Sequence, residues 1–222
     1  MSTILITGAN RGIGLALTRG YQASGQRVIA VCRHRSEALD ELGVEVLSGI
    51  DVTRAEDLSR LHTAVADASI TILINNAGVL GRTEFDRIED QLDDYRQQFE
   101  VNALAPLRVT HALSDRLQSG SKVVIVTSRM GSMADNTSGG AFAYRMSKAA
   151  VNAAGVSLAH ELKARGVAVV LLHPGYVRTD MTNHNGLIDA DESAESLIQR
   201  IAALELDQTG SFWHANGEVL PW

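Results

Sequence analysis

The 222-residue chain has a single cysteine and no long apolar run. Cys32 has no second cysteine with which to form an intrachain disulfide, and its strand-like neighbourhood predicts a packed, unreactive thiol in a reducing cytoplasm. The longest aliphatic run, Val167 to Leu172, is too short to cross a bilayer. We therefore expect a cytoplasmic protein with neither a signal peptide nor a membrane span.

Patterns typical of metal sites and nucleic-acid surfaces are also missing. The seven histidines form no His-x-x-x-His or Cys/His cluster, so the sequence predicts no metal site. The net charge is -6 and Lys and Arg are not clustered. Because phosphate neutralisation needs a basic face, this argues against nucleic-acid and anionic-membrane partners. We expect small-molecule chemistry or protein partners instead.

Short apolar, β-branched runs alternate with stretches of helical spacing. The expected strands cover Thr3 to Thr7, Arg27 to Cys32, Val44 to Leu47, Ile70 to Ile74, Lys122 to Thr127, Val167 to Leu172 and Ser211 to His214. Parallel strands need crossover helices and bury both faces. The pattern predicts an α/β fold over residues 1–222: a single-domain, Rossmann-type, doubly wound parallel sheet of about seven strands, with helices on both faces.

Several local signals mark where helices begin and end. Thr53 and Glu56 predict a capping box at a helix start, and Leu58, Leu61 and Val65 share one face of that helix. Gly25 and Gly166 stand where helices are expected to stop. The segment from Ser132 to Gly140, rich in Ser, Asn and Gly, is expected to be an irregular loop.

The first expected strand runs into a glycine-rich segment, Thr7-Gly8-Ala9-Asn10-Arg11-Gly12-Ile13-Gly14, followed by a helical stretch to about Ser24. Glycines let the backbone turn sharply and approach a pyrophosphate, whose charge is met by the start of the helix. A strand-to-helix turn without a ligand is the alternative. The Gly-x-Gly-x-x-Gly pattern does not fit, because Leu17 stands where its last glycine would be.

The pattern Thr-Gly-x-x-x-Gly-x-Gly instead resembles the short-chain dehydrogenase/reductase family. Further markers of that family follow in order: Asp51-Val52, Asn75-Asn76-Ala77-Gly78, Asn102, Ser128, Tyr144-Arg145-Met146-Ser147-Lys148, Pro174-Gly175 and Thr179. The resemblance spans nearly the whole chain. The segments from Gly131 to Gly140, Tyr144-Arg145 and Gly217 to Trp222 look like the C-factor and sniffer-like branch, which includes signalling factors and carbonyl reductases.

The resemblance implies an NAD(P)(H)-dependent oxidoreductase that interconverts a small-molecule carbonyl and an alcohol by hydride transfer. The implied catalytic residues are Asn102, Ser128, Tyr144 and Lys148, with Tyr144 as the general acid/base. The implied coenzyme-binding residues are Gly8, Asn10, Arg11, Gly12, Ile13, Gly14, Arg33, Asp51, Val52, Asn76, Ala77, Gly78, Tyr144, Lys148, Pro174, Gly175, Val177 and Thr179.

Tyr144 and Lys148 are four residues apart, so they share one face of a helix. A phenol with a pKa near ~10 is a poor acid or base at neutral pH. The ammonium and a positive nicotinamide are expected to lower the Tyr144 pKa, although an ordinary surface pair is the alternative. Ser128 is preferred to Ser132 because it directly follows an expected strand. Pro106 has no N–H for the Asn102 carbonyl, so we expect a kink there.

The expected coenzyme is NADP(H), with NAD(H) possible. No acidic residue follows the second expected strand, and Arg11 and Arg33 stand where relatives of this family meet the 2′-phosphate. The segment from Tyr176 to Asp191 is short, so an open pocket is expected and the substrate is not identified. His173 is expected to be a strand-end residue without a role.

Family habit implies a homodimer or homotetramer. The candidate interface residues are Leu104, Leu107, Val109 and Leu113. The alternative function is a dinucleotide-binding signalling or regulatory protein of C-factor type with little turnover. The retained set of Asn102, Ser128, Tyr144 and Lys148 favours the enzyme.

Overall fold

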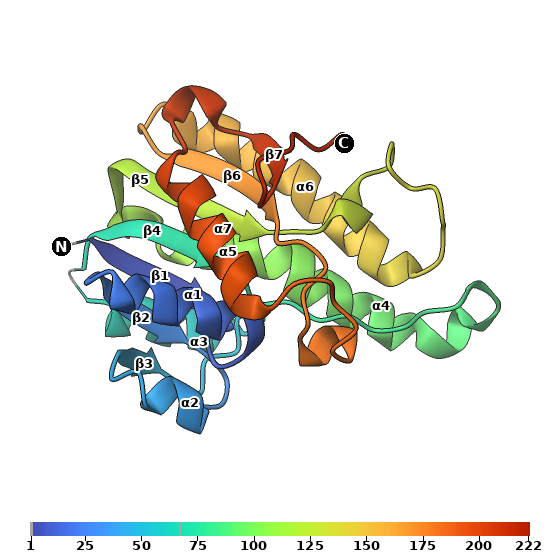
Figure 1. Cartoon of the computed structure of the whole chain (residues 1–222), viewed down its shortest axis with the longest axis horizontal. Coiled ribbons are helices and arrows are strands. Elements are labelled where there is room, and N and C mark those ends of the chain that lie inside the picture. Colours follow the sequence, from blue (N-terminus) through green and yellow to red (C-terminus); the bar gives the residue numbers. More distant parts are fainter. Residues whose placement is uncertain (1, 67) are drawn as a thin grey trace.

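The computed structural model describes residues 2–66 and 68–222 of the chain, which fold around one parallel sheet (Figure 1). Its strand order is β3-β2-β1-β4-β5-β6-β7. The strands are β1 Thr3–Thr7, β2 Arg27–Val31, β3 Glu45–Leu47, β4 Ile70–Asn75, β5 Leu117–Val126, β6 Ala168–His173 and β7 Ser211–His214. The expected doubly wound sheet is confirmed.

Helices connect the strands and cover both faces of the sheet. They are α1 Gly12–Ala23, α2 Glu37–Asp40, α3 Ala55–Ala64, α4 Leu92–Phe99, the π-helical turn η3 Glu100–Leu104, α5 Ala105–Ala112, α6 Phe142–Lys163 and α7 Ala190–Ala202. Short 3₁₀ turns are η1 Phe85–Arg87, η2 Glu89–Gln91, η4 Ser114–Arg116, η5 Arg129–Gly131, η6 Asp180–Thr182 and η7 Leu206–Gln208.

The two faces of the sheet bury separate cores. Successive residues of a strand point to opposite sides. Leu5 packs in the core beneath α3, α5 and α6, whereas Ile4 and Ile6 pack in the core beneath α1 and α7. Burial on both faces is what a parallel sheet requires, and it explains why the expected strands read as continuous apolar runs.

The helix ends agree with the sequence in some places and differ in others. Gly25 and Gly166 follow α1 and α6 with φ of +75° and +71°, as expected. The capping box is wrong: α3 begins at Ala55 and has no side-chain cap. Thr53 is engaged elsewhere, because its N–H and hydroxyl donate to Asp51 at 2.9 and 2.7 Å.

The expected kink at Asn102 is a π-helical turn. The N–H of Ala105 donates to the carbonyl of Glu100, five residues earlier, so η3 contains one residue more than an α-helical turn. Pro106, which has no N–H, follows directly. α4, η3 and α5 therefore form one continuous, kinked helix, with Asn102 in the middle of the π-helical turn.

Two of the four residues expected at a subunit interface are in the core. Val109 is 1% exposed and Leu113 is fully buried, because both pack beneath the sheet with α3. Leu104 is exposed and Leu107 is half-buried. The apolar periodicity of this helix reflects its packing against the sheet. Only Leu104 and Leu107 remain accessible for contact with another subunit.

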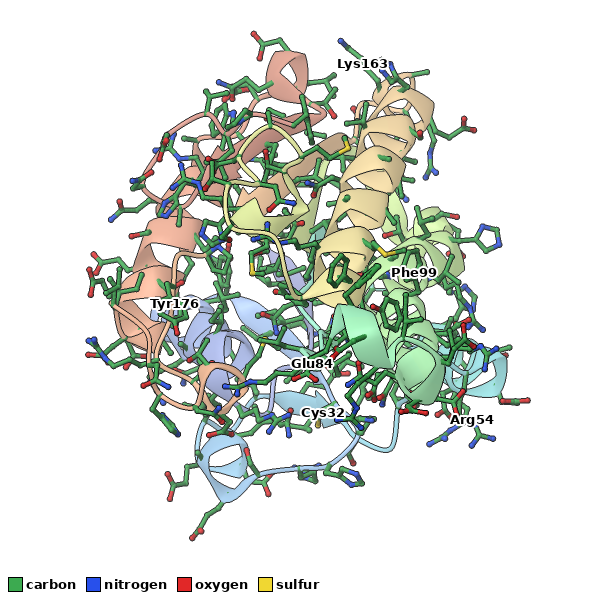
Figure 2. The ribbon with its side chains drawn as sticks, turned by 90° about the vertical axis from the view of Figure 1, so that its right-hand side faces the viewer. Cys32, Arg54, Glu84, Phe99, Lys163 and Tyr176 are labelled. Atoms are coloured by element: carbon green, nitrogen blue, oxygen red, sulfur yellow. The ribbon has the colours of Figure 1, made fainter. Side chains whose placement is uncertain are left out.

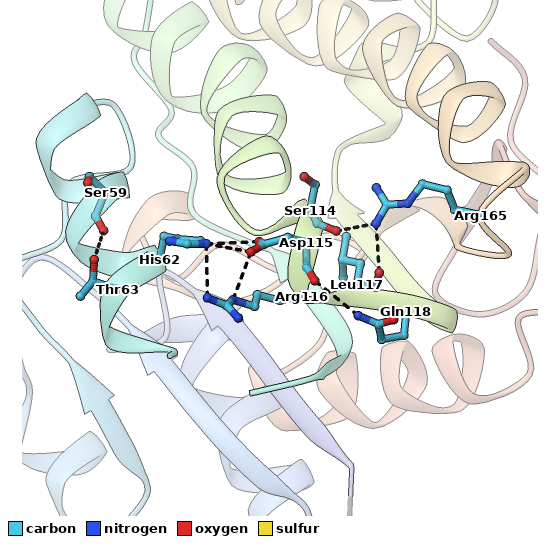
Figure 3. Close-up of polar contacts among 9 residues, drawn as sticks. All are labelled: Ser59, His62, Thr63, Ser114, Asp115, Arg116, Leu117, Gln118 and Arg165. Atoms are coloured by element: carbon cyan, nitrogen blue, oxygen red, sulfur yellow. Dashed lines mark hydrogen bonds and ion pairs between the residues drawn. The ribbon is translucent and has the colours of Figure 1, made fainter. Parts of the chain in front are cut away.

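Polar contacts join the helices at the edge where β5 begins (Figure 3). His62 at the end of α3 lies 3.0 Å from Asp115 in η4, and Arg165 donates to the carbonyl of Leu117 at 3.0 Å. β5 starts at Leu117, earlier than the expected Lys122, and its pairing with β4 shifts register between Ile70 and Ile72. These contacts lie at the amino-terminal end of β5, away from the carboxyl ends where the candidate site is found.

Among residues 2–66 and 68–222, no helix is both long and apolar enough to pass through a membrane.

Candidate active site

A cleft of about 400 Å³ lies at the carboxyl ends of the central strands. The chain leaves β1 toward β2 on one side and returns to β4 on the other, so the cleft sits where the strand order reverses. In open α/β sheets, ligands bind at this switch point. Figure 2 looks toward this end of the molecule and labels Cys32, which lines the cleft.

Most residues expected at the site line this cleft. They are Gly8, Asn10, Arg11, Gly12, Ile13, Gly14, Arg33, Asp51, Val52, Asn76, Ala77, Gly78, Tyr144, Lys148, Pro174 and Thr179. Four expected residues do not line it, namely Asn102, Ser128, Gly175 and Val177. Ten further lining residues were not expected: Val31, Cys32, His34, Ile50, Val79, Val101, Val126, Thr127, Asp180 and Met181.

The glycine-rich turn brings the start of α1 directly against the end of β1. Gly8 has φ +67°, and a Cβ on Gly14 would lie 2.1 Å from the carbonyl oxygen of Gly8, so neither position accommodates a side chain. The side chain of the N-cap residue Arg11 makes no capping hydrogen bond to the first turn of α1, and no acidic residue lies in that turn. The unpaired N–H groups of this turn therefore make a site for an anion.

Asn76 joins the turns that follow β1 and β4. The Thr7 hydroxyl accepts hydrogen bonds from the N–H groups of Asn76 and Ala77, both at 3.1 Å. The side-chain amide of Asn76 donates to the carbonyls of Thr7 and Gly8 at 3.0 and 3.2 Å. The two strand ends are thus held together at the floor of the cleft.

Asp51 lies at the β3 side of the cleft. Burial raises the pKa of its carboxyl, but hydrogen bonds from Thr53 and the positive charges of Arg33 and Arg54 outweigh this, so the pKa lies below its ordinary value. Asp51 is therefore an ionised acceptor at neutral pH. A carboxylate here can accept hydrogen bonds from a ligand's amino or hydroxyl groups.

Cations surround the β2 end of the cleft. Arg33 and Arg11 are both exposed and both line the cleft. Arg11 forms an exposed ion pair with Asp180 of η6 at 3.3 Å. Cys32, which directly precedes Arg33, is 3% exposed, and burial raises the pKa of its thiol, in agreement with the expected packed cysteine.

Tyr144 and Lys148 occupy the other end of the cleft, on the first turns of α6. The ammonium of Lys148 lies 5.8 Å from the centre of the Tyr144 ring and donates to the carbonyl of Val126 at 3.0 Å. Burial raises the pKa of Tyr144 to about 12 and lowers the pKa of Lys148 to about 8. The expected net lowering of the Tyr144 pKa is wrong, because burial outweighs the influences that favour the phenolate. The contribution of a nicotinamide charge stays a prediction.

Ser128 contacts Tyr144, and Ser132 contacts its own loop. A hydrogen bond between the side chains of Ser128 and Tyr144 favours the phenolate and opposes the effect of burial on the Tyr144 pKa. The Ser128 hydroxyl also accepts from the N–H of Met130 at 3.1 Å. Ser132 instead accepts from the N–H of Asp135 at 3.1 Å. The geometry therefore favours Ser128 over Ser132 as the serine beside the phenol.

Asn102 lies behind the cleft rather than in its wall. Its side-chain oxygen accepts from the N–H of Val79 at 2.9 Å, and its amide donates to the Val79 carbonyl at 2.9 Å and to Ser147 at 3.0 Å. The Ser147 hydroxyl in turn donates to the carbonyl of Tyr144 at 2.8 Å. Asn102 thus connects the turn after β4 to the helix that carries Tyr144.

The residues from Pro174 to Asp189, between β6 and α7, form a small flap that lines part of the cleft. Val177 is 3% exposed and pairs with Ile188 in an isolated parallel bridge. Gly175 has φ +92°, and a Cβ there would lie 2.9 Å from Ile188. Gly175 and Val177 therefore shape the base of the flap from outside the cleft.

Two histidines lie beneath this flap. The ring of His173, at the end of β6, packs edge-on against that of His214 at 4.9 Å. Burial lowers the pKa of His173 to about 3, so its ring is neutral. This agrees with a strand-end residue that plays no part in proton transfer.

Sequence reasoning missed Asp180 and Met181, which reach the cleft from the flap. No local pattern marks them, since the contact between Arg11 and Asp180 joins residues 169 positions apart. Cys32 and His34 could have been predicted from the sequence as cleft residues, because they flank Arg33 at the end of an expected strand. In the part of the chain that the structure describes, no group of three His, Cys, Asp or Glu could hold a metal ion.

Comparison with known proteins gives consistent results. A family model described as short chain dehydrogenase matches residues 2–187. A 1-hydroxy-2-glutathionyl-2-methyl-3-butene dehydrogenase of Rhodococcus sp. strain AD45 is 39% identical, with 100% of both chains covered. C-signal of Myxococcus xanthus is 43% identical over 72% of this chain and 97% of its own.

Solved structures agree with these sequence relatives. The carbonyl reductase Sniffer of D. melanogaster has a TM-score of 0.92 at 30% identity, covering 100% of both chains. An NADPH-bound carbonyl reductase from chicken fatty liver has a TM-score of 0.91 at 26% identity, covering 100% of this chain and 99% of its own. The chain therefore belongs to the short-chain dehydrogenase/reductase family of oxidoreductases, in its C-factor and sniffer-like branch.

Proposed function

We propose that the protein is an NADP(H)-preferring enzyme that interconverts a small carbonyl compound and its alcohol, with Tyr144 as the general acid/base. One observation carries the proposal: the start of α1 lies at one end of the cleft and Tyr144 and Lys148 lie at the other, with Ser128 hydrogen-bonded to Tyr144 from outside the cleft wall. The first turn of α1 would hold the phosphates of a dinucleotide, and Tyr144 and Lys148 would contact its nicotinamide end.

The residues along the cleft suit the parts of that coenzyme. The first turn of α1 would hold the pyrophosphate, and Arg11 and Arg33 would meet the 2′-phosphate by paired guanidinium contacts. Lys148 would donate to the nicotinamide ribose. The NADPH bound to the chicken fatty liver carbonyl reductase supports the same class of coenzyme here.

When bound, NADPH supplies a hydride for the carbonyl carbon. The new C–H bond leaves negative charge on the carbonyl oxygen, and the Tyr144 hydroxyl transfers its proton to that oxygen. Ser128 donates a hydrogen bond to the same oxygen, which stabilises the charge as it develops. The buried ammonium of Lys148 stabilises the phenolate that remains.

Replacing Tyr144 with Phe tests the mechanism. Carbonyl reduction is expected to fall by ~10²–10⁴, because only the transferable proton is lost while the ring still packs. The NADPH dissociation constant is expected to stay within a few-fold. Aldehydes, ketones, quinones and a glutathionyl alcohol of the kind named for the Rhodococcus relative form the substrate panel.

Tyr21→Phe is the matched control. Tyr21 is 5% exposed, and its hydroxyl has no hydrogen-bond partner among the described residues. The Tyr21→Phe variant therefore removes the same hydroxyl oxygen from a buried tyrosine that does not line the cleft. Full activity of Tyr144→Phe on a working substrate would show that the proposed mechanism is wrong.

Coenzyme preference needs a separate measurement. Dissociation constants for NADPH and NADH by fluorescence titration are expected to favour NADPH, and Arg33→Ala is expected to reduce that difference. Tighter NADH binding would contradict the preference.

C-signal supports a second candidate, a dinucleotide-binding signalling protein with little turnover. The two functions predict different results on the substrate panel. Tight NADPH binding with no reduction of any aldehyde, ketone or quinone would favour the signalling protein.

A further inference from the structure

The final segment, Gly217–Trp222, folds back along β7 and packs beside the loop that follows Ser128. Val219 forms an antiparallel bridge with Trp213, and the N–H of Leu220 donates to the carbonyl of Phe212 at 2.9 Å. Leu220 is 3% exposed, and the Trp222 ring stacks on Phe212 at 5.3 Å. This segment is therefore anchored on the edge of the sheet.

The anchored segment makes two polar contacts with the loop. The carbonyl of Trp222 accepts from the N–H of Ala134 at 2.9 Å. Glu218 lies 2.8 Å from the guanidinium of Arg129, whose Nε lies 2.7 Å from Asp135. Arg129 thus connects its own turn, the following loop and the final segment, and it directly follows Ser128.

The same turn is pressed against α6 from the other side. The carbonyl of Ser128 accepts from the N–H of Gly131 at 2.8 Å. A Cβ on Gly131 would lie 2.7 Å from the backbone of Lys148, so the turn rests directly on the helix that carries the catalytic pair. A shift of η5 therefore changes the distance between Ser128 and Tyr144.

We propose that Gly217–Trp222 is a positioning element for Ser128, and that Arg129 is the positioning residue that links the two. This inference rests on the proposed carbonyl chemistry. The final segment and α6 hold η5 between them, and the ion pair of Arg129 with Glu218 fixes its rotation. Without the ion pair, η5 is less constrained, so the Ser128 side chain can move away from the Tyr144 phenol.

This role differs from an ordinary contribution to stability. The side chains of Arg129 and Glu218 are 41% and 49% exposed, and ion pairs this exposed contribute little to stability. Their loss is therefore expected to leave the unfolding midpoint nearly unchanged. A displacement of about 1 Å at a reacting group, however, lowers the rate by up to ~10²-fold.

The test compares Arg129→Met, Arg129→Lys and Glu218→Gln with the wild type. Arg129→Met is expected to lower kcat for carbonyl reduction on the order of 10-fold, with the NADPH dissociation constant within about two-fold. Glu218→Gln is expected to act in the same direction, and Arg129→Lys to recover part of the loss. Hydrogen exchange at the amides of residues 129–134 is expected to become faster in both charge-removing variants.

Glu45→Gln is the matched control. Glu45 pairs with Arg27 at 2.7 Å, with side chains 36% and 45% exposed, at an edge of the sheet away from the cleft. It is expected to change neither kcat nor the exchange of residues 129–134.

The outcomes separate this inference from the proposed function. If the wild type reduces a carbonyl and the variants match it in kcat and in exchange, the positioning role is wrong. If exchange becomes faster in the variants but the wild type reduces no carbonyl, the proposed function fails and the contact between the final segment and η5 is supported.

Discussion

Arg11 is paired with Asp180, a residue that a coenzyme phosphate would displace. Both side chains are exposed, at 67% and 60%, so the pair itself is weak. Asp180→Asn is expected to tighten NADPH binding by about two- to five-fold, because Arg11 no longer has to leave a carboxylate. NADH binding is expected to change less. Fluorescence titration of both coenzymes measures the difference.

Asp191→Asn provides the control for that charge change. Asp191 pairs with Arg19 and is 70% exposed, so the variant removes the same charge from another ion pair. Equal effects of Asp180→Asn on NADPH and NADH would contradict a competition for the 2′-phosphate.

The burial of Lys148 carries a cost in stability. Burial lowers its pKa from 10.5 to about 8, which corresponds to roughly 3 kcal/mol against the folded state while the ammonium is protonated. The cost is complete below pH 8. It is relieved between about pH 8 and 10.5, where the folded protein has lost the proton that the unfolded chain still binds.

Lys148→Met is therefore expected to raise the free energy of unfolding at pH 7 by about 1–3 kcal/mol, after the lost hydrogen bond to Val126 is subtracted. The gain is expected to fade by pH 10.5, and coenzyme affinity to fall. Urea unfolding at both pH values measures this. Lys163→Met, on the exposed end of α6, is the control. A gain that does not vary with pH would contradict the charge argument.

At the level of residues, the sequence predicts what is local. Gly8, Asn76 and Asp51 stand at strand ends, where the chain itself marks them. The pKa of Tyr144 could not be predicted, because its direction depends on burial by α6 and the loops around it. The place of Asp180 in the cleft could not be predicted for a similar reason. Asp180 lies far from Arg11 in the sequence, and only the folded structure brings the two side chains together.

Among the elements, η3 shows how far a local signal extends. Pro106 predicted a kink near Asn102, and a kink is present. The additional residue that makes it a π-helical turn could not be predicted from the proline alone, because it depends on how α4 packs against α6 and how α5 packs against α6 and β4. The capping box failed because Asp51 competes for Thr53.

Lys122 in β5 caps the end of α7 from a distant part of the chain. Its ammonium donates to the carbonyls of Ile201 and Ala202 at 2.8 and 3.0 Å. The last carbonyls of a helix lack partners within it, and a cation there is favourable. Lys122→Met is expected to lower the free energy of unfolding by about 1 kcal/mol. Urea unfolding measures this, and a midpoint equal to that of the wild type would refute the cap.

For the whole molecule, the alternation of strands and helices was enough to predict the doubly wound sheet. Strand order was not predicted, since pairing between β1 and β4 joins residues far apart in the sequence. Nor could periodicity alone separate the apolar residues that pack beneath the sheet from those on the surface, as Val109 and Leu113 show.

The assembly state stays a prediction. A homodimer or homotetramer is expected, and Leu104, 44% exposed on η3, is the remaining strong candidate for an interface. Leu104→Glu is expected to shift the assembly toward monomer in light scattering. Leu206→Glu, 37% exposed on η7, is the control. A wild-type monomer at micromolar concentration would rule the assembly out.

The position of β1 in the interior of the sheet, between β2 and β4, also determines when the protein can fold during synthesis. β1 pairs with β2 through Ile4 and Val28, but its other neighbour, β4, supplies Ile72. A nascent chain that ends before β4 leaves one edge of β1 open and its apolar side chains uncovered. Pairings of such long range form slowly. The cleft is lined by residues that follow β1, β2 and β4, so coenzyme can bind only after β4 has paired with β1. A ligand that binds only the folded state stabilises it, so abundant coenzyme would favour the complete sheet over the chain in which β4 is unpaired.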